Sequence, residues 1–374
     1  MRFPEFEGEW EKKRLEECVE FLDGLRKPIK SEDRKSEQGL YPYFGASGII
    51  DYIDGYIFDG EYILLSEDGA NIIDRNYRVA FIAKGKIWVN NHAHVLQPYD
   101  GFDINFLSET LERLNYAVYN TGTTMPKLNQ EVCRNINLKI PTTKEQNKIG
   151  NLLSLLNKRI ATQNKIIDKL QSLIKGINQR VFMNNGINYK LGEICEIRSG
   201  YSGNQLLSKK GLKVSRIETI SGHKVNMERV GYVAPFESSD NYRLRVGDIL
   251  FSNINSVEYI GNTAFIDKDY DLYHGMNLLR LIPNNMVVIP FYLYLLINTN
   301  RMLNRFKTVC NKAVSQASIN QTELGKTVVQ IPDINAQKQI CELYQALYDK
   351  LESEKYANSL FQKQKQYLLR QMFI

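Results

Sequence analysis

The chain contains 374 residues with a formal net charge of +6, and 43% of its residues are hydrophobic. This composition is typical of a globular protein and excludes a disordered chain, while the length predicts two domains with connecting segments. The longest apolar run, from Val287 to Ile297, is interrupted by Pro290 and is too short to cross a bilayer. Because the first residues contain no apolar signal core, we expect a cytoplasmic protein.

The charge distribution and the cysteine content further limit the class of protein. The excess of Lys and Arg over Asp and Glu is −6 for residues 1–141, +6 for 142–185, +5 for 186–331 and +1 for 332–374. Net charge therefore does not establish nucleic-acid binding, and a DNA-binding face on the acidic first segment would have to be local. The five cysteines are widely spaced and form no CxxC pair, which predicts neither a disulfide framework nor a zinc site.

Taken in chain order, the predicted elements mix strands and helices. Runs rich in β-branched and aromatic residues predict strands at 62–66, 78–83, 86–96, 248–254, 262–266 and 276–282. Apolar residues at helical spacing predict helices at 106–114 and 291–306. This mixture predicts the α+β class for each globular part.

The chain also repeats itself. The segment that begins at Lys127 matches the one that begins at Ser318, and Pro141 falls opposite Pro332 without a gap. Weaker matches reach the front of each half. These ordered matches predict a duplicated unit. Its expected boundaries are 1–141 for the first globular part, 142–185 for a helix, 186–331 for the second globular part and 332–374 for a second helix.

A long helix is predicted after each Ile-Pro pair, because proline disfavours helical conformation in the residue before it. Both helices show a heptad seam of mainly apolar residues. In the first seam, Gln163 is either a register-setting polar residue or an exposed one. Two copies related by a pseudo-twofold axis would pair as an antiparallel coiled coil. The apolar residues that we expect to pair the helices are Leu153, Leu156, Ile160, Ile167, Leu170, Ile174, Ile177, Leu347, Leu351, Phe361 and Leu368.

Several motifs of the repeated unit are distinctive when taken together. They are YPYFGASGIIDY, SEDGAN, WVNNHAHVL, TGTTMPKLNQ and IPTTKEQNKIG in the first half, and GDILFSNINSVEYIGNTAFI, SQASINQTEL and IPDINAQKQI in the second. Over essentially its whole length the chain thereby resembles the specificity subunits of type I restriction–modification enzymes. One departure is visible: Ala336 replaces the glutamate of the usual Glu-Gln pair, which the first copy has as Glu145-Gln146.

The resemblance implies two target recognition domains, each reading one half of a bipartite, asymmetric DNA site. The helices would act as a ruler and as docking sites for two methyltransferase subunits, joined by two restriction subunits. S-adenosylmethionine, ATP and Mg would belong to those partners, so this chain would be non-catalytic and would hold no cofactor. In agreement, the sequence contains no motif for a flipped adenine and no GxxxxGK phosphate loop. A coiled-coil interaction scaffold and a free-standing DNA-binding regulator stay open as alternatives.

Candidate DNA contacts follow from the chemistry of the side chains, since Arg and Lys bind phosphates while Asn, Gln, Arg, Ser and Thr read base edges. Asn and Thr in loops also serve turns and caps. In the first globular part the candidates are Lys84, Lys86, Asn90, Asn91, His92, Thr121, Thr123, Thr124 and Lys127. In the second they are Arg216, Ser252, Asn253, Asn255, Asn277, Lys312, Ser315, Gln316 and Ser318.

A metal site is a further possibility at His92 and His94, which would share one face of a strand. No cysteine or acidic residue lies at a spacing that would complete a zinc site. We therefore predict no metal here, and expect the two histidines to pack or to contact DNA.

Overall fold

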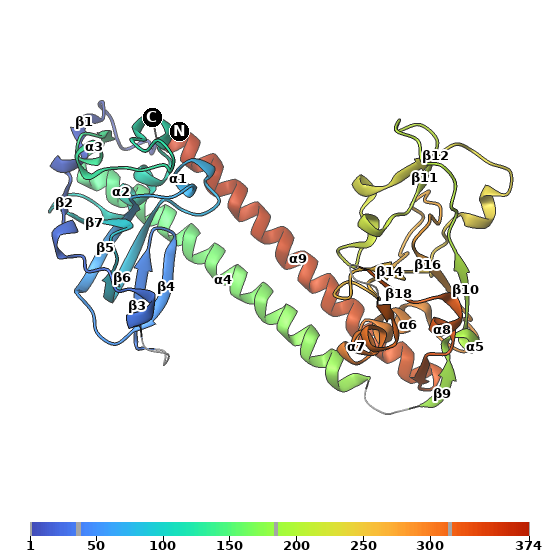
Figure 1. The fold of residues 1–374 in the computed structure, drawn as a ribbon. Coiled ribbons are helices and arrows are strands. Elements are labelled where there is room, and N and C mark those ends of the chain that lie inside the picture. The colour runs from blue at the N-terminus through green and yellow to red at the C-terminus, as the bar shows by residue number, and fades with distance from the viewer. Residues whose placement is uncertain (1, 35–38, 183–185, 313–315, 374) are drawn as a thin grey trace. The chain divides into compact units, whose positions relative to one another are not determined.

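The computed structural model describes residues 2–34, 39–182, 186–312 and 316–373. Its contacts divide the chain into two compact units. Unit 1 consists of Met1–Lys165 and Tyr356–Ile374, and unit 2 of Ile166–Lys355. Each unit holds a globular part together with segments of two long helices, α4 (Thr143–Val181) and α9 (Ile334–Met372), which are green and red in Figure 1.

The globular part of unit 1 is built on one mixed sheet. Among the described residues its strand order is β2-β7-β5-β6-β3-β4, and every neighbouring pair is antiparallel except β3 with β6. The strands are β2 (Val19–Phe21), β3 (Tyr41–Gly45), β4 (Gly48–Ile53), β5 (Phe58–Ser66), β6 (Ala80–Val89) and β7 (Ala93–Pro98).

Both faces of the sheet are buried along the second half of β5, which explains its apolar run from Tyr62 to Leu65. Ile63 and Leu65 face one hydrophobic cluster, whereas Leu64 faces the other, as the two-residue period of a strand requires. A short pair, β1 (Glu11–Arg14) with β8 (Asn137–Ile140), leads into α4. The helices of this part are α1 (Asn71–Asp74), α2 (Ile104–Glu112) and α3 (Gln130–Arg134).

Unit 2 has a smaller antiparallel sheet of strand order β10-β16-β13-β15. Its strands are β10 (Cys195–Ser199), β13 (Ile249–Phe251), β15 (Thr263–Phe265) and β16 (Leu279–Pro283), and its helices are α5 (Leu191–Ile194), α6 (Pro290–Ile297), α7 (Asn300–Val309) and α8 (Gln321–Gly325). Short pairings join β9 (Ile187–Lys190) to β19 (Val328–Ile331) and β11 (Leu212–Val214) to β12 (Gly231–Val233). In a third small sheet, β18 (Ala317–Ser318) lies between β14 (Ile254–Asn255) and β17 (Asn311–Lys312).

Several predicted elements needed correction. The helix expected at 291–306 is two helices, because the chain turns at Asn298 and Thr299 caps α7 through Met302 N. The strand expected at 86–96 is two strands, because β6 ends at Val89 and β7 begins at Ala93. Polar side chains that bond the main chain locally explain both breaks.

The first turn of each long helix contains a buried glutamine at the same position. Gln146 donates to Pro141 O and accepts from Asp103 N, the cap residue of α2. In the second copy, Gln337 donates to Pro332 O and accepts from Ile289 N, the residue that precedes α6. The two glutamines therefore attach both helices to their globular parts in the same way.

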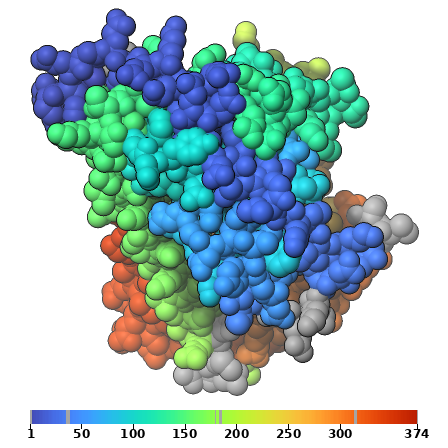
Figure 2. Space-filling model, turned by 90° about the vertical axis from the view of Figure 1, so that its left-hand side faces the viewer, coloured from blue at the N-terminus to red at the C-terminus, as the bar shows by residue number. Residues whose placement is uncertain are grey.

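The neighbouring position differs between the copies. Glu145 is buried and forms a bidentate ion pair with Arg2 at 2.6–2.7 Å, and Figure 2 shows the dark blue N-terminal residues against the green start of α4. Ala336 has no carboxylate for such a pair. There Asp333 accepts hydrogen bonds from the backbone N–H groups of Asn335 and Ala336, so α9 has its own acidic cap.

In unit 1 the beginning of α4 and the end of α9 pack into the core of the globular part. Phe373 stacks on Phe106 of α2 with a centroid distance of 5.3 Å, and Leu153 and Met372 join the same cluster. Glu109 of α2 is also buried, and its Oε1 accepts from Asn157 of α4 at 2.8 Å and from Lys365 of α9 at 3.1 Å. Arg78 donates to the same oxygen at 2.7 Å.

Contacts between α4 and α9 run in opposite directions along the two helices. In unit 1, Asn164 bonds Asn358, while Arg159 lies over the ring of Phe361. In unit 2, Ile167, Leu170, Ile174 and Ile177 share a cluster with Leu347 and Leu351. All residues expected to pair the helices, including Leu156, Ile160 and Leu368, are buried or half-buried. No helix in the described residues is both long and apolar enough to span a membrane.

Candidate functional site

A closed loop at 120–128 precedes the first long helix. The Asn120 side chain accepts hydrogen bonds from the N–H groups of Gly122 and Lys127, and Thr121 donates twice to Lys127 O. The loop therefore closes on itself, with the side chains of Thr123 and Thr124 exposed at its tip.

Main-chain hydrogen bonds attach this loop to the end of β5. Leu128 N donates to Glu67 O at 2.7 Å, and Gly69 N donates to Pro126 O at 3.0 Å. The carbonyl oxygen of Leu128 lies 2.8 Å from Nε2 of His94 in β7. The loop is thus held to two strands of the sheet.

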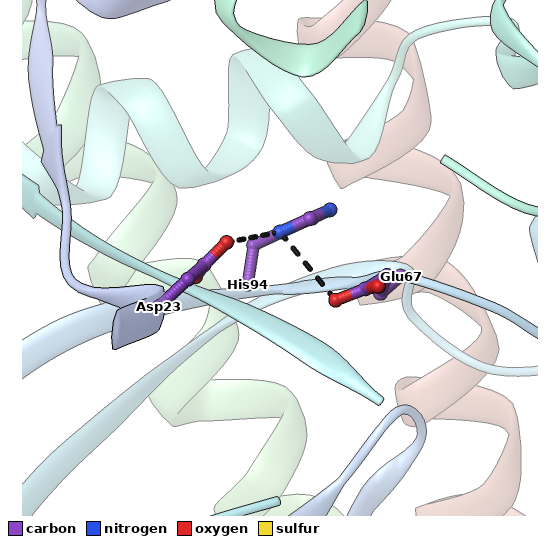
Figure 3. Close-up of side chains that lie close together, drawn as sticks. All are labelled: Asp23, Glu67 and His94. Atoms are coloured by element: carbon purple, nitrogen blue, oxygen red, sulfur yellow. Dashed lines mark hydrogen bonds and ion pairs between the residues drawn. The ribbon is translucent and has the colours of Figure 1, made fainter. Parts of the chain in front are cut away.

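His94 is buried, and both of its ring nitrogens face oxygen acceptors. Nδ1 lies 2.6 Å from the Asp23 carboxylate and 3.8 Å from that of Glu67 (Figure 3). Nε2 lies 2.8 Å from the Leu128 carbonyl oxygen. Burial raises the pKa of Asp23, but its hydrogen bonds with His94 and Val95 N outweigh this and lower that pKa, so the carboxylate is ionised and only accepts. Both ring nitrogens then carry a proton, and the ring is an imidazolium. Burial lowers the pKa of His94, but the hydrogen bonds with Asp23 and Cys133 outweigh it and raise that pKa to about 10.

The ligand atoms of Asp23, Glu67 and His94 lie within 4.8 Å of one another, as they could around a metal ion. The surrounding cations argue against that use. Arg26 lies 2.7 Å from Glu67 and 3.5 Å from Asp23, and Lys127 lies 3.5 Å from Glu67. A protonated histidine cannot ligate a metal, and these cations already balance the carboxylates. The residues present therefore fit an ion-pair network that fixes the loop.

The turn that joins β6 to β7 lies beside the loop. Asn90 is buried and its Oδ1 accepts from His92 N, while the exposed His92 ring lies 2.9 Å from Asp68. Asp68 forms a β-bridge with Lys127. The structure thus places this turn beside the loop at 120–128. The exposed candidates on the two segments are Asn91, His92, Thr121, Thr123, Thr124 and Lys127.

The remaining candidates of unit 1 have other positions. Lys84 pairs with Glu61 on the neighbouring strand at 2.8 Å, and Lys86 lies over the ring of Tyr56. The buried side chain of Asn90 shapes the turn and does not face solvent. The predicted common face of His92 and His94 is wrong, because β7 begins only at Ala93 and His92 belongs to the turn.

Unit 2 holds a corresponding loop that ends at Ile319. Ile319 N donates to Asn253 O at 2.9 Å, as Leu128 N does to Glu67 O. Here Asn253 Nδ2 donates to Ile319 O at 3.4 Å, where unit 1 uses His94. Lys312 and Gln316 are exposed and Ser318 is half-buried. Ser315 lies outside the described residues.

The other candidates of unit 2 are dispersed. Ser252 is fully buried and its hydroxyl accepts from Asn255 Nδ2 at 3.1 Å, so this pair stabilises a turn. Arg216 is exposed at the start of a 3-10 helix, and Asn277 occupies a turn with φ of 64° before β16. The sequence analysis did not identify the residues that hold the two loops. The repeat contained a signal, because it matches Gln130 with Gln321. Their side chains donate hydrogen bonds to the Asp23 carboxylate and to Ile197 O, respectively.

Comparison with known proteins agrees with this duplicated arrangement. The family model described as "Type I restriction modification DNA specificity domain" matches residues 7–172 and again residues 186–359. The chain belongs to this family. Each of the two matches covers one globular part and an adjoining stretch of long helix.

Relatives within the family are specificity subunits of type I restriction enzymes. The MjaX subunit of Methanocaldococcus jannaschii is 43% identical over 158 residues, which cover 41% of this chain and 37% of the relative. A subunit of Haemophilus influenzae is 36% identical over 150 residues, covering 40% and 37%. These alignments thus span little more than a third of either relative. The MjaVIII subunit of M. jannaschii aligns over 99% of this chain and 92% of its own length at 24% identity.

Solved structures share the fold. The S subunit of a type I restriction–modification system from M. genitalium superposes with a TM-score of 0.69, covering 100% of this chain and 99% of its own, at 16% identity. A chain from a study of type I complex assembly and conformational transition gives 0.57 over 99% and 98%, at 15% identity.

Proposed function

We propose that this family member is the non-catalytic, DNA-reading subunit of a type I restriction–modification complex and recognises a bipartite, asymmetric site. The observation that carries the proposal is one loop held at equivalent places in both units. Leu128 and Ile319 each donate a backbone hydrogen bond to the residue that follows the repeated serine at the end of β5 or β13. Two similarly anchored loops provide two readers on one chain.

The two loops differ in the side chains that they expose. The first carries Thr123, Thr124 and Lys127, and the second carries Lys312 and Gln316. Hydroxyl and amide groups read base edges, whereas lysines bind phosphates. Different polar groups on the two loops favour two different half-sites, and hence an asymmetric target.

We also propose that α4 and α9 pair as an antiparallel coiled coil with pseudo-twofold symmetry and that two adenine methyltransferase subunits dock on the helices. Support comes from large apolar side chains that the helices leave exposed, among them Leu155, Leu173 and Tyr356. Burial of these side chains against a partner subunit would be favourable. Restriction subunits would join through the methyltransferases, and S-adenosylmethionine, ATP and Mg would bind to these partners.

The decisive experiment is to express the chain with a type I adenine methyltransferase subunit and to map methylated adenines. We expect a split motif that is methylated only when both proteins are present. Thr123→Ala combined with Thr124→Ala should relax one half of that motif and leave the other unchanged, because the two loops are separate readers.

The matched control is Ser221→Ala, which removes an exposed hydroxyl that donates to Glu218 O and lies outside both loops and both long helices. Methylation that is the same with and without this chain would contradict the proposed function. Relaxation of both half-sites by the loop variant would contradict the separation of the two readers.

A further inference from the structure

A pocket of about 460 Å³ in unit 2 is rich in arginine. It opens beside the edge strand β10 and also contains the turn that precedes β13. Its charged lining residues are Arg198, Arg243, Arg245, Arg280, Glu196, Asp240 and Asp248. The arginines exceed the carboxylates by one charge, so the lining is positive.

Two of the arginines face each other across neighbouring strands. Arg198 of β10 and Arg280 of β16 are register partners, which places their side chains on one face of the sheet. Each has one carboxylate: Arg198 pairs with Glu196 at 2.6 Å, and Arg280 with Asp248 at 2.6 Å. Like charges at opposed positions repel each other, and an anion bound beside the two guanidiniums would reduce the repulsion that the two carboxylates leave.

Arg280 is the most constrained member of the pocket, with only 4% of its surface exposed. A guanidinium has five N–H donors. Nη2 donates to Asp248 and Nη1 to Asn241 O at 3.3 Å, but Nε finds no acceptor among the described residues. Burial raises the pKa of Asp248 despite this ion pair. An unsatisfied buried donor is costly, and an oxyanion in the pocket would relieve that cost.

Arg245 adds a further cation to the lining of the same pocket. Its backbone N–H donates to Asp248 Oδ2 at 2.6 Å, which fixes the turn. Its side chain is exposed and has no ion-pair partner within the part of the chain that the structure describes. By contrast, Arg243 is already paired with Asp269 at 2.9 Å.

We propose that this pocket binds a phosphate group through Arg245, Arg198 and Arg280, and that in the assembled complex the group belongs to the DNA backbone. The fork of a guanidinium matches the geometry of phosphate oxygens. The single excess positive charge matches one phosphodiester. The DNA part of this inference depends on the function proposed above, whereas binding of phosphate as such does not.

The first test titrates inorganic phosphate into the full chain by calorimetry, at constant ionic strength set with chloride. We expect Arg245→Gln to weaken phosphate binding about tenfold, since a charge-assisted hydrogen bond is lost. Arg229→Gln removes an exposed arginine that does not line the pocket and should leave binding unchanged. Arg280→Lys keeps the charge but loses the fork, and should also weaken binding.

The second test measures DNA affinity of the complex with its methyltransferase against salt concentration. Arg245→Gln should reduce the slope of log affinity against log salt by about one, and equally for duplexes with and without the target site. A reduced phosphate affinity with an unchanged slope would assign the pocket to the phosphate of a small molecule and refute the DNA source.

Absence of phosphate binding by the unmodified chain, or an equal loss in Arg229→Gln, would overturn the phosphate pocket. Absence of any DNA binding by the unmodified complex would refute the proposed function, while the phosphate titration would still decide the fate of the pocket.

Discussion

At the scale of single residues, His94 shows how a buried charge can hold a loop. Its ring connects Asp23 to the Leu128 carbonyl, and Arg26 and Lys127 balance the second carboxylate, Glu67. The sequence could not predict this network, because its members come from four separate segments. Spacing along the chain does not reveal which side of a strand a single histidine faces when the strand boundary is uncertain.

We expect His94→Gln to lower the free energy of unfolding by on the order of 3 kcal/mol, because it removes the nearer cation of the buried Asp23 carboxylate and leaves only Arg26 at 3.5 Å. His92→Gln is the matched control, since His92 is an exposed residue of the adjoining turn and its pair with Asp68 is worth little. Urea unfolding of both variants at pH 7 would measure the difference. Equal free energies of unfolding for the two variants would show that the network does not stabilise the fold.

The same group predicts a pH dependence that distinguishes the two loops. The pKa of His94 is raised from 6.5 to about 10 in the folded state, so its stabilising effect is complete below pH 6.5 and is lost as the pH rises through about 10. Asp23, Glu67, Arg26, Lys127 and Cys133 are the charged and titratable groups around it.

Hydrogen exchange, corrected for intrinsic rates, should therefore show Leu128 N–H losing protection as the pH rises from 6.5 to about 10. Ile319 N–H should not, because an uncharged Asn253 amide holds the corresponding carbonyl in unit 2. A parallel loss at both amides would point to general unfolding and contradict the assignment. In His94→Gln, the difference between the loops should disappear.

At the scale of elements, the long helices could be predicted from the sequence in both extent and orientation of their faces. Their apolar residues recur at a spacing that only a helix places on one side, and all of the expected positions are buried or half-buried. Less could be predicted of short elements. Ser252 and Asn255 look like base readers in sequence but bond each other inside a turn, a role that depends on tertiary contacts.

The C-terminal end of α9 gives a prediction for stability. We expect Phe373→Ala to destabilise unit 1 by about 3 kcal/mol, because the ring stacks on Phe106 and also contacts Trp10. Tyr367→Ala in α9 is the control, since the side chain of Tyr367 is exposed. Thermal unfolding monitored by tryptophan fluorescence would compare them, and similar midpoints would contradict a role of Phe373 in the core.

At the scale of the whole molecule, the two halves use one plan with different chemistry. Each long helix begins with a buried glutamine and follows a loop attached to its sheet, yet one loop is held by an ionic network and the other by an amide. The internal repeat predicted the common plan. It could not predict the different anchors, because these residues lie in the parts of the repeat that have diverged.

The proposed ruler function of the helices makes a prediction at this scale. Inserting seven residues into both α4 and α9 keeps the heptad seam in register and adds about 10.5 Å, which corresponds to about three base pairs. Methylome mapping should find the same half-sites with a longer spacer. An unchanged spacer in a folded, active complex would refute the ruler.

The packing of Met372 and Phe373 into unit 1 has a consequence for synthesis on the ribosome. The strands of this unit and α2 emerge early, but the side chains that complete their core emerge only after the whole of unit 2 has been translated. Domains that fold during translation usually close in order from the N-terminus. Here the first domain to be made is the last to be finished, and its apolar core must be protected in the meantime.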